Sequence, residues 1–253
     1  MTTKSIYIVS TGRAGSTFLY KFFQKYYPEF EITHQTKWSR IINIIGNLPF
    51  GHTFKCWSLR KSFKHFKKQD LPNTTLDPLL SFPISELLRT KPAQEVKIIH
   101  LVRHPQDFAN SFMRWKSSSL RKMILHYLIP FWQPVALFNG VGFIKSLQMS
   151  KYEKFCWIWN FKNAKFNLLN KDYDYLLIKM ELLIRPDSQD VWHKLIDFVA
   201  LPQKEIDYNS FVSNRINKSN NNKATKEKHT VEKQKTLCQR YCGGLANTLG
   251  YKI

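Results

Sequence analysis

The feature that most constrains the fold of this chain is a short apolar run that leads directly into a glycine-containing turn and then a helix. The run is Ser-Ile-Tyr-Ile-Val-Ser at residues 5–10, and the turn is Thr-Gly-Arg-Ala-Gly-Ser-Thr at residues 11–17. Residues 18–26 have the apolar spacing of an amphipathic helix, which Pro28 ends. A strand, a turn with glycines and a helix in this order are typical of the start of a nucleotide-binding α/β domain.

The alternation of strands and helices continues along the chain. Further strands are expected at residues 96–102 and 173–180, a short one at 30–33 and another candidate at 53–57. Helices are expected at residues 106–116, 153–169, 188–200 and 237–249, and residues 214–229 have the composition of a solvated loop. Because helices alternate with strands, we predict one doubly wound, mostly parallel α/β domain over residues 1–253.

The charge of the chain points to an anionic partner. Lys and Arg number 39 against 18 Asp and Glu, which gives a net charge of +21. Such a surplus suits nucleic acid, an anionic membrane, a sulfated or phosphorylated substrate, or a nucleotide. The 43% of hydrophobic residues excludes a largely disordered chain, and only 9 glycines exclude a collagen-like one.

The cysteines give no sign of a metal site or an oxidising compartment. Cys56, Cys156, Cys238 and Cys242 form no C-x-x-C pair and no zinc-ligand spacing, and the last two are expected as buried thiols on a helix. The expected strand begins only four residues after Met1, which leaves no room for a signal peptide there. We therefore expect a cytoplasmic protein.

The turn at residues 11–17 has the chemistry of an anion-binding loop. The N–H groups at the start of the following helix are unpaired, and Ser16 and Thr17 add hydroxyl donors. Arg13 adds a fixed positive charge that can bind phosphate through two N–H groups. In the Walker pattern, Gly15 and Thr17 match, but Ser10 replaces the first glycine and Ser16 replaces the lysine. The alternative is an ordinary strand-to-helix turn with Arg13 facing solvent.

The strand expected at residues 96–102 ends in a basic residue. Metal-dependent kinases place an Asp that helps to hold magnesium at such a position, whereas this strand runs into Arg103. A guanidinium repels a metal ion but binds a phosphate. Ser111 follows eight residues later, in the second turn of the next helix, so Arg103 and Ser111 can approach one anion from two sides. The alternative for Ser111 is a hydroxyl that bonds back to Asp107.

Three stretches of the chain resemble the sulfotransferase family, and together they span most of residues 5–202. The loop at residues 13–17 resembles the family's 5′-phosphosulfate loop, commonly [RK]-S-G-[ST]-T, with Ala14 in place of the usual serine. Residues 97–111 resemble its 3′-phosphate motif, a strand that ends in V-R-[DNH]-P-x-D with a serine after it. Residues 175–183 resemble its later strand, with Met-Glu-Leu at 180–182 where Glu-Asp-Leu is expected.

The resemblance implies a P-loop-like α/β fold and a metal-free reaction. The donor would be 3′-phosphoadenosine-5′-phosphosulfate (PAPS), and its product adenosine 3′,5′-bisphosphate. The sulfuryl group would pass to an acceptor hydroxyl or amine, on a carbohydrate, a lipid or a small alcohol. The donor-binding residues that the resemblance implies are Arg13, Ala14, Gly15, Ser16, Thr17, Phe18, Arg103 and Ser111. The family's C-terminal Arg-Lys-Gly loop has no clear copy here, and Lys218 and Lys223 are its nearest substitutes.

The acceptor needs a base, which is usually His or Glu in this family. His34 follows the short strand expected at residues 30–33, and that strand should end on the side of the Arg13 loop. His52 precedes the strand candidate at 53–57 and is the second candidate. Histidine suits the task because its ordinary pKa lies near neutral pH. Lys55 can also stabilise the transferring group. The alternative for His34 and His52 is a surface or core histidine, and the alternative for Lys55 is a solvated lysine.

Two segments interrupt the α/β pattern. Residues 59–68, Leu-Arg-Lys-Ser-Phe-Lys-His-Phe-Lys-Lys, suit a polyanionic acceptor or nucleic acid, or form a solvated amphipathic helix. Residues 123–144 contain no charged residue and belong to a hydrophobic insertion at 123–149. Its length would span a bilayer, but Pro130 and Pro134 interrupt it. A lid over the acceptor, a peripheral membrane contact and a hairpin packed on the core all remain open.

The sequence thus predicts a PAPS-dependent sulfotransferase without a metal, in which Arg13 acts in both donor binding and catalysis. One alternative is a P-loop-type kinase, which Ser16 and Arg103 disfavour. The other is a basic nucleic-acid-binding protein without catalysis, which only the net charge suggests. We do not expect nucleic acid as the partner.

Overall fold

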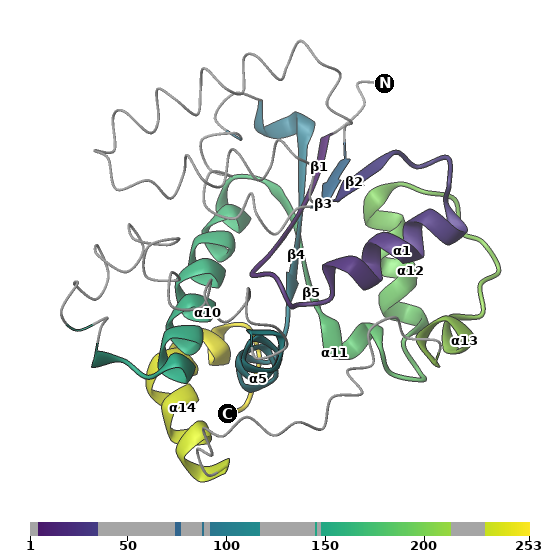
Figure 1. Ribbon diagram of the computed structural model, residues 1–253. Helices are drawn as coiled ribbons and strands as arrows, with labels where there is room; N and C mark the ends of the chain where they lie inside the picture. Colours follow the sequence, from purple (N-terminus) through teal and green to yellow (C-terminus); the bar gives the residue numbers. More distant parts are fainter. Residues whose placement is uncertain are drawn as a thin grey trace.

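The computed structural model in Figure 1 describes residues 5–34, 74–76, 88, 92–116, 145, 148–213 and 231–253. Its centre is a five-stranded sheet with the order β2-β3-β1-β4-β5, in which every described pairing is parallel. The strands are β1 (Ser5–Ser10), β2 (Ile32–His34), β3 (Thr74–Leu76), β4 (Val96–Val102) and β5 (Asp174–Lys179).

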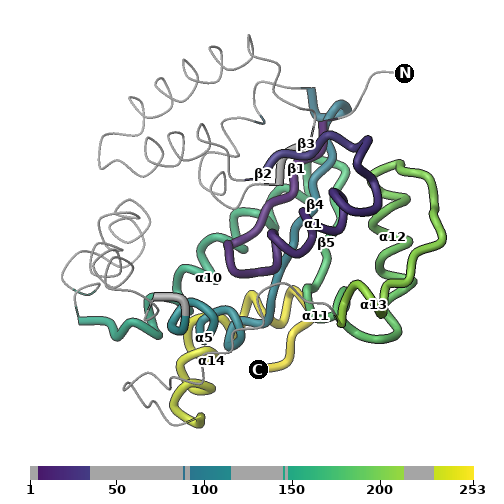
Figure 2. Tube along the Cα trace, turned by 45° about the vertical axis from the view of Figure 1, so that its right-hand side comes forward, coloured from purple at the N-terminus to yellow at the C-terminus, as the bar shows by residue number. Residues whose placement is uncertain are grey.

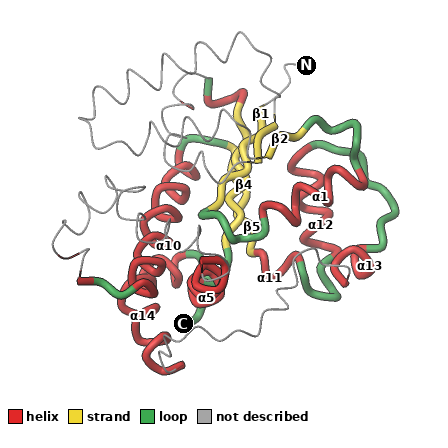
Figure 3. Tube along the Cα trace, in the orientation of Figure 1, coloured by secondary structure: helices red, strands yellow, loops and turns green. Residues whose placement is uncertain are grey.

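Helices cover both faces of this sheet, as the colouring of Figure 3 makes clear. On one face lie α1 (Ser16–Tyr26), α12 (Gln189–Val199) and α13 (Tyr208–Ser213). On the other lie α5 (Pro105–Lys116), α10 (Lys151–Asn167) and α14 (Val231–Thr248). Short elements complete the described chain: α11 (Met180–Leu183) and the 3₁₀ turns η2 (Ala93–Glu95) and η3 (Leu168–Lys171). The predicted doubly wound, parallel α/β architecture is confirmed.

The central strands are apolar on both sides because both sides are covered. In β1 the side chains of Ile6 and Ile8 face the layer of α1 and α12, whereas Tyr7 and Val9 face the opposite side. All six residues of β1 are buried. This is why the strand reads as a continuous apolar run rather than as an alternating pattern.

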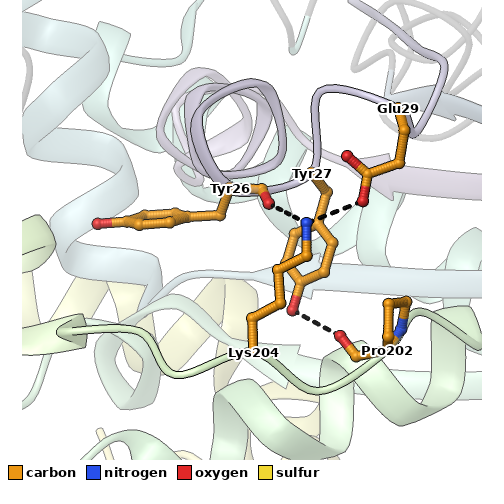
Figure 4. Close-up of polar contacts among 5 residues, drawn as sticks. All are labelled: Tyr26, Tyr27, Glu29, Pro202 and Lys204. Atoms are coloured by element: carbon orange, nitrogen blue, oxygen red, sulfur yellow. Dashed lines mark hydrogen bonds and ion pairs between the residues drawn. The ribbon is translucent and has the colours of Figure 1, made fainter.

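Aromatic side chains hold the α1 layer together. The Trp192 ring of α12 is fully buried and packs against Phe22 of α1 and Tyr208 of α13, at centroid distances of 4.0 and 5.6 Å. Beyond the end of α1, Lys204 Nζ donates to the Tyr26 carbonyl at 2.8 Å and pairs with Glu29 at 2.9 Å (Figure 4). These contacts fasten the segment that follows α12 to the end of α1.

The opposite layer is built around α10, which lies against α14 in both Figure 1 and Figure 2. Cys156 of α10 and Cys238 and Cys242 of α14 are buried free thiols in this interface. The prediction of buried thiols at Cys238 and Cys242 is confirmed, and Cys56 lies outside the described residues.

The register of the sheet brings the carboxyl ends of its strands to one edge. Ser10 of β1 pairs with Leu101 of β4, and Val102 of β4 pairs with Lys179 of β5. His34, which was expected just after a strand at 30–33, is itself the last residue of β2 and pairs with Leu76 of β3. The sequence did not predict β3, and the strand candidate at 53–57 lies outside the described residues.

Candidate functional site

The loop between β1 and α1 has a backbone that depends on its glycines. Gly12, Arg13 and Gly15 have φ values of 78°, 55° and 94°, in the left-handed region that favours glycine. At Gly15 a Cβ atom would also clash with the side chain of Met180, the first residue of α11, so space as well as the positive φ favours glycine there. Arg13 adopts this region without being glycine, which is an uncommon conformation and a mark of functional loops.

Arg103 and Ser111, which were predicted to approach one anion, both contact Arg13 of the β1–α1 loop. Arg13 Nε donates to Ser111 Oγ at 3.2 Å, and an Arg103 guanidinium N–H donates to the Arg13 carbonyl at 3.2 Å. These residues come from the β1–α1 loop, the end of β4 and the second turn of α5. The Ser111 hydroxyl therefore accepts a hydrogen bond from the loop.

Positive charge concentrates at this point. Partial burial lowers the pKa of Arg13 below its ordinary value, and the charges of Arg103 and Arg114 lower it further. Arg114 was not among the sequence candidates. It lies three residues after Ser111 on α5, so both side chains leave the same face of the helix. This spacing could have identified Arg114 from the sequence.

The first turn of α1 supplies unpaired donors beside these charges. No side chain caps α1, whose N-cap is Gly15, so its first N–H groups face the loop. Ser16 is buried, and Thr17 is half-buried. Ala14 and Phe18 are buried, and the Phe18 ring packs on Trp192 and Phe211, so these two residues can offer a ligand only their backbone.

His34 lies beside the same helix start. Its Nε2 is 3.4 Å from Ser16 Oγ, and its ring stacks on Tyr20 of α1 with a centroid distance of 5.1 Å. Burial lowers the pKa of His34 below its ordinary value, so the imidazole is neutral at pH 7. A neutral imidazole can accept a proton. The structure brings His34 and Ser16 into contact at the same edge of the sheet as the loop that carries Arg13.

The loop that carries Arg103 is held by residues that the sequence did not single out for this role. The Trp159 indole Nε1 donates to the Arg103 carbonyl at 2.8 Å, and the His104 amide donates to Glu181 Oε1 at 2.7 Å. Tyr251 OH donates to the other oxygen of Glu181 at 2.9 Å. Glu181 was noted only as a departure from a family motif, and no local pattern marks Trp159 or Tyr251.

A comparison with solved structures identifies the architecture. The chain superposes on the "Sulfotransferase Domain from the Curacin Biosynthetic Pathway" with a TM-score of 0.53 and 16% sequence identity, over 99% of this chain and 98% of that chain. The chain has the fold of a sulfotransferase domain. No protein-family model matches the sequence, and no curated protein matches it either.

Several sequence predictions fall on residues that the structure does not describe. These are the second base candidate His52, Lys55, the donor candidates Lys218 and Lys223, the basic segment 59–68 and the uncharged segment 123–144. Within the described ranges, no helix is long and apolar enough to cross a membrane. The same part of the chain contains no group of three or more His, Cys, Asp or Glu that could hold a metal ion.

Proposed function

We propose that this protein is a PAPS-dependent sulfotransferase. It transfers the sulfuryl group of PAPS to a hydroxyl or amine of an acceptor and releases adenosine 3′,5′-bisphosphate. The observation that supports this best is the meeting of Arg13, Arg103 and Ser111 at the carboxyl edge of a parallel sheet. In open parallel α/β sheets, ligands bind at this edge.

The two ends of the site match the two anionic ends of the donor. The 5′-phosphosulfate lies over the Arg13 loop, where the N–H groups at the start of α1 and the hydroxyls of Ser16 and Thr17 donate. The 3′-phosphate lies between Arg103 and Ser111. The donor carries roughly three to four negative charges, which guanidinium groups and a helix N-terminus can neutralise.

In the reaction, the acceptor oxygen or nitrogen forms a bond to sulfur while the bond from sulfur to the 5′-phosphate oxygen breaks. His34 takes the proton that the acceptor loses, because its neutral imidazole faces the loop beside Ser16. Negative charge develops on the leaving 5′-phosphate oxygen, where Arg13 and Thr17 stabilise it. We expect this transfer to be in-line and loose, as phosphoryl transfer is.

A carbohydrate, a lipid and a small alcohol all remain acceptor classes for this proposal. The uncharged segment 123–144 can still be a lid over the acceptor, a peripheral membrane contact or a hairpin packed on the core. A cytoplasmic location stays an expectation from the sequence. A screen of hydroxyl acceptors with labelled PAPS addresses the acceptor directly.

A P-loop-type kinase is the weaker alternative for this site. Arg103 follows β4 where a kinase would place a metal-binding Asp, and it donates toward the Arg13 loop. A guanidinium there repels magnesium. Sulfuryl transfer should therefore continue in excess EDTA, whereas a kinase would lose its activity.

The test of the donor site compares two nucleotides. Arg103→Ala should weaken binding of adenosine 3′,5′-bisphosphate far more than binding of adenosine 5′-phosphate, because the proposal assigns the Arg103 guanidinium to the 3′-phosphate and not to the 5′-phosphate. The expected loss is about 1.5–3 kcal/mol, or about tenfold or more in Kd, by calorimetry. Arg240→Ala is the matched control, since this arginine lies on α14 over the Tyr241 ring. Equal losses for both nucleotides in Arg103→Ala would contradict the assignment.

A further inference from the structure

The peptide group that joins Arg103 to His104 is fixed at both of its polar ends. Its carbonyl accepts from the Trp159 indole at 2.8 Å, and its N–H donates to Glu181 Oε1 at 2.7 Å. A peptide plane held from both sides cannot rotate, so the backbone dihedral angles that flank it are set. Because the Arg103 side chain leaves the Cα next to this plane, its direction depends on Trp159 and Glu181.

Glu181 is itself fixed by a residue from the far end of the chain. Tyr251 OH donates to Glu181 Oε2 at 2.9 Å, so each carboxylate oxygen has a donor. Burial raises the pKa of Tyr251, and the charge of Glu181 raises it further, so this hydroxyl is a donor at any physiological pH. The Tyr251 ring also meets the His104 ring edge-on, with centroids 5.4 Å apart.

The segment around Tyr251 is fastened to two strands of the sheet. Lys179 Nζ, at the end of β5, donates to the Gly250 carbonyl at 2.7 Å. His104 Nε2 lies 3.3 Å from the Lys252 carbonyl, which can only accept, so the imidazole donates there. Figure 1 shows this end of the chain beside α5, at the carboxyl edge of the sheet. Residues 250–252 thus connect the end of β4 to the end of β5.

We propose that Glu181, held in place by Tyr251, is the positioning residue of the 3′-phosphate site. It fixes the Arg103–His104 peptide so that the Arg103 guanidinium meets the Arg13 loop and the anion that Ser111 also contacts. The inference rests on the proposed function, since it concerns the donor phosphate that Arg103 binds. In this proposal Glu181 acts through Arg103 and does not itself contact the donor or the acceptor.

The experiment measures how much the 3′-phosphate contributes to binding, as the ratio of the Kd of adenosine 5′-phosphate to that of adenosine 3′,5′-bisphosphate. Glu181→Ala should lower this ratio about tenfold, because Arg103 loses its fixed direction. Glu181→Gln should keep a ratio close to that of the wild type, because its oxygen still accepts from His104 and its amide can donate to Tyr251. If Glu181 only stabilises the fold and does not position Arg103, Glu181→Ala should lower the melting temperature and leave the Kd ratio unchanged.

Two further variants complete the test. Tyr251→Phe removes a single oxygen and should lower the Kd ratio by a smaller factor than Glu181→Ala. If Glu181→Ala does not fold, Tyr251→Phe tests the positioning role in its place. Glu29→Ala is the matched control, because it removes a carboxylate that pairs with Lys204 far from the site (Figure 4). It should leave the ratio unchanged.

The outcomes separate this inference from the proposed function. Suppose that Arg103→Ala lowers the Kd ratio while Glu181→Ala and Tyr251→Phe fold and keep the ratio of the wild type. The donor site then stands, and the positioning role of Glu181 is wrong. An equal loss for both nucleotides in Glu181→Ala also overturns the positioning role. If the wild type itself shows no preference for the bisphosphate, the donor assignment fails and this inference fails with it.

Discussion

At the scale of single residues, His34 is where geometry and charge agree best on a chemical role. The imidazole is half-buried, stacks on Tyr20 and lies 3.4 Å from Ser16 Oγ. Burial disfavours the charged form, so the pKa of His34 lies below its ordinary 6.5. The lowered pKa favours the neutral imidazole, which is the form that can accept a proton.

His34→Ala should therefore lower kcat by roughly 10²–10⁴ and leave the affinity for adenosine 3′,5′-bisphosphate unchanged. In the wild type the rate should rise with pH to a plateau, with an inflection below 6.5, because the protonated imidazole is inactive and its pKa is depressed. The inflection should be absent in the variant. His193→Ala, on α12, should behave as the wild type. If His34→Ala keeps most of its kcat, the base lies elsewhere, and His52 is the next candidate.

The residues of the site differ in whether a local sequence motif marks them. Arg13, Arg103 and Ser111 could be predicted, because each belongs to a local motif at the end of a recognisable strand or in the next helix. Glu181 and Tyr251 could not. Their partners are a backbone amide 77 residues away and a carboxylate 70 residues away, and no local pattern encodes such contacts.

At the scale of elements, a buried hydrogen-bonded triad links β4, β5 and α10. His100 is fully buried; its Nε2 donates to Asn163 Oδ1 at 2.8 Å, and its Nδ1 accepts from Tyr175 OH at 2.6 Å. Because the asparagine oxygen only accepts, this assigns the neutral tautomer with hydrogen on Nε2. Burial lowers the pKa of His100 to about 4, and the bond to Asn163 offsets part of that shift.

The triad should make the stability of the fold depend on pH in a defined window. The unfolded chain binds a proton at His100 near pH 6.5 and the folded protein only near pH 4, so stability falls as pH drops from 6.5 to 4. The expected loss from His100 is about 3 kcal/mol. Urea unfolding across this range should show the loss in the wild type and in His193→Gln, and not in His100→Gln. Parallel curves for the wild type and His100→Gln would contradict it.

Elements were predicted well where their ends have chemical markers. β1 and β4 match the prediction to the residue, because Thr-Gly follows one and Arg-His-Pro follows the other. α10 begins at Lys151 rather than 153, since Ser150 and Glu153 form a capping box that the apolar spacing did not reveal. β3 has three residues and is defined by its backbone pairing to β1 and β2, which no side-chain pattern marks.

At the scale of the whole molecule, the fold does not explain the net charge of +21. Part of it is at the proposed donor site, where Arg13, Arg103 and Arg114 interact electrostatically. We expect the remaining charge to act at a distance. A surplus of one sign attracts an oppositely charged ligand before contact, which raises the association rate more than it slows dissociation.

Association of adenosine 3′,5′-bisphosphate should therefore slow as salt is added. Between about 0.01 and 0.15 M ionic strength the Debye length shortens from about 30 to about 8 Å, which screens all but the nearest charges. Stopped-flow measurements should show the association rate falling about tenfold or more, with a smaller change in dissociation. Adenosine, which has the same base and sugar without phosphate, should associate at a rate that barely changes. A salt-independent rate for the bisphosphate would mean that the positive surplus is not directed toward this site, and that another anionic partner accounts for it.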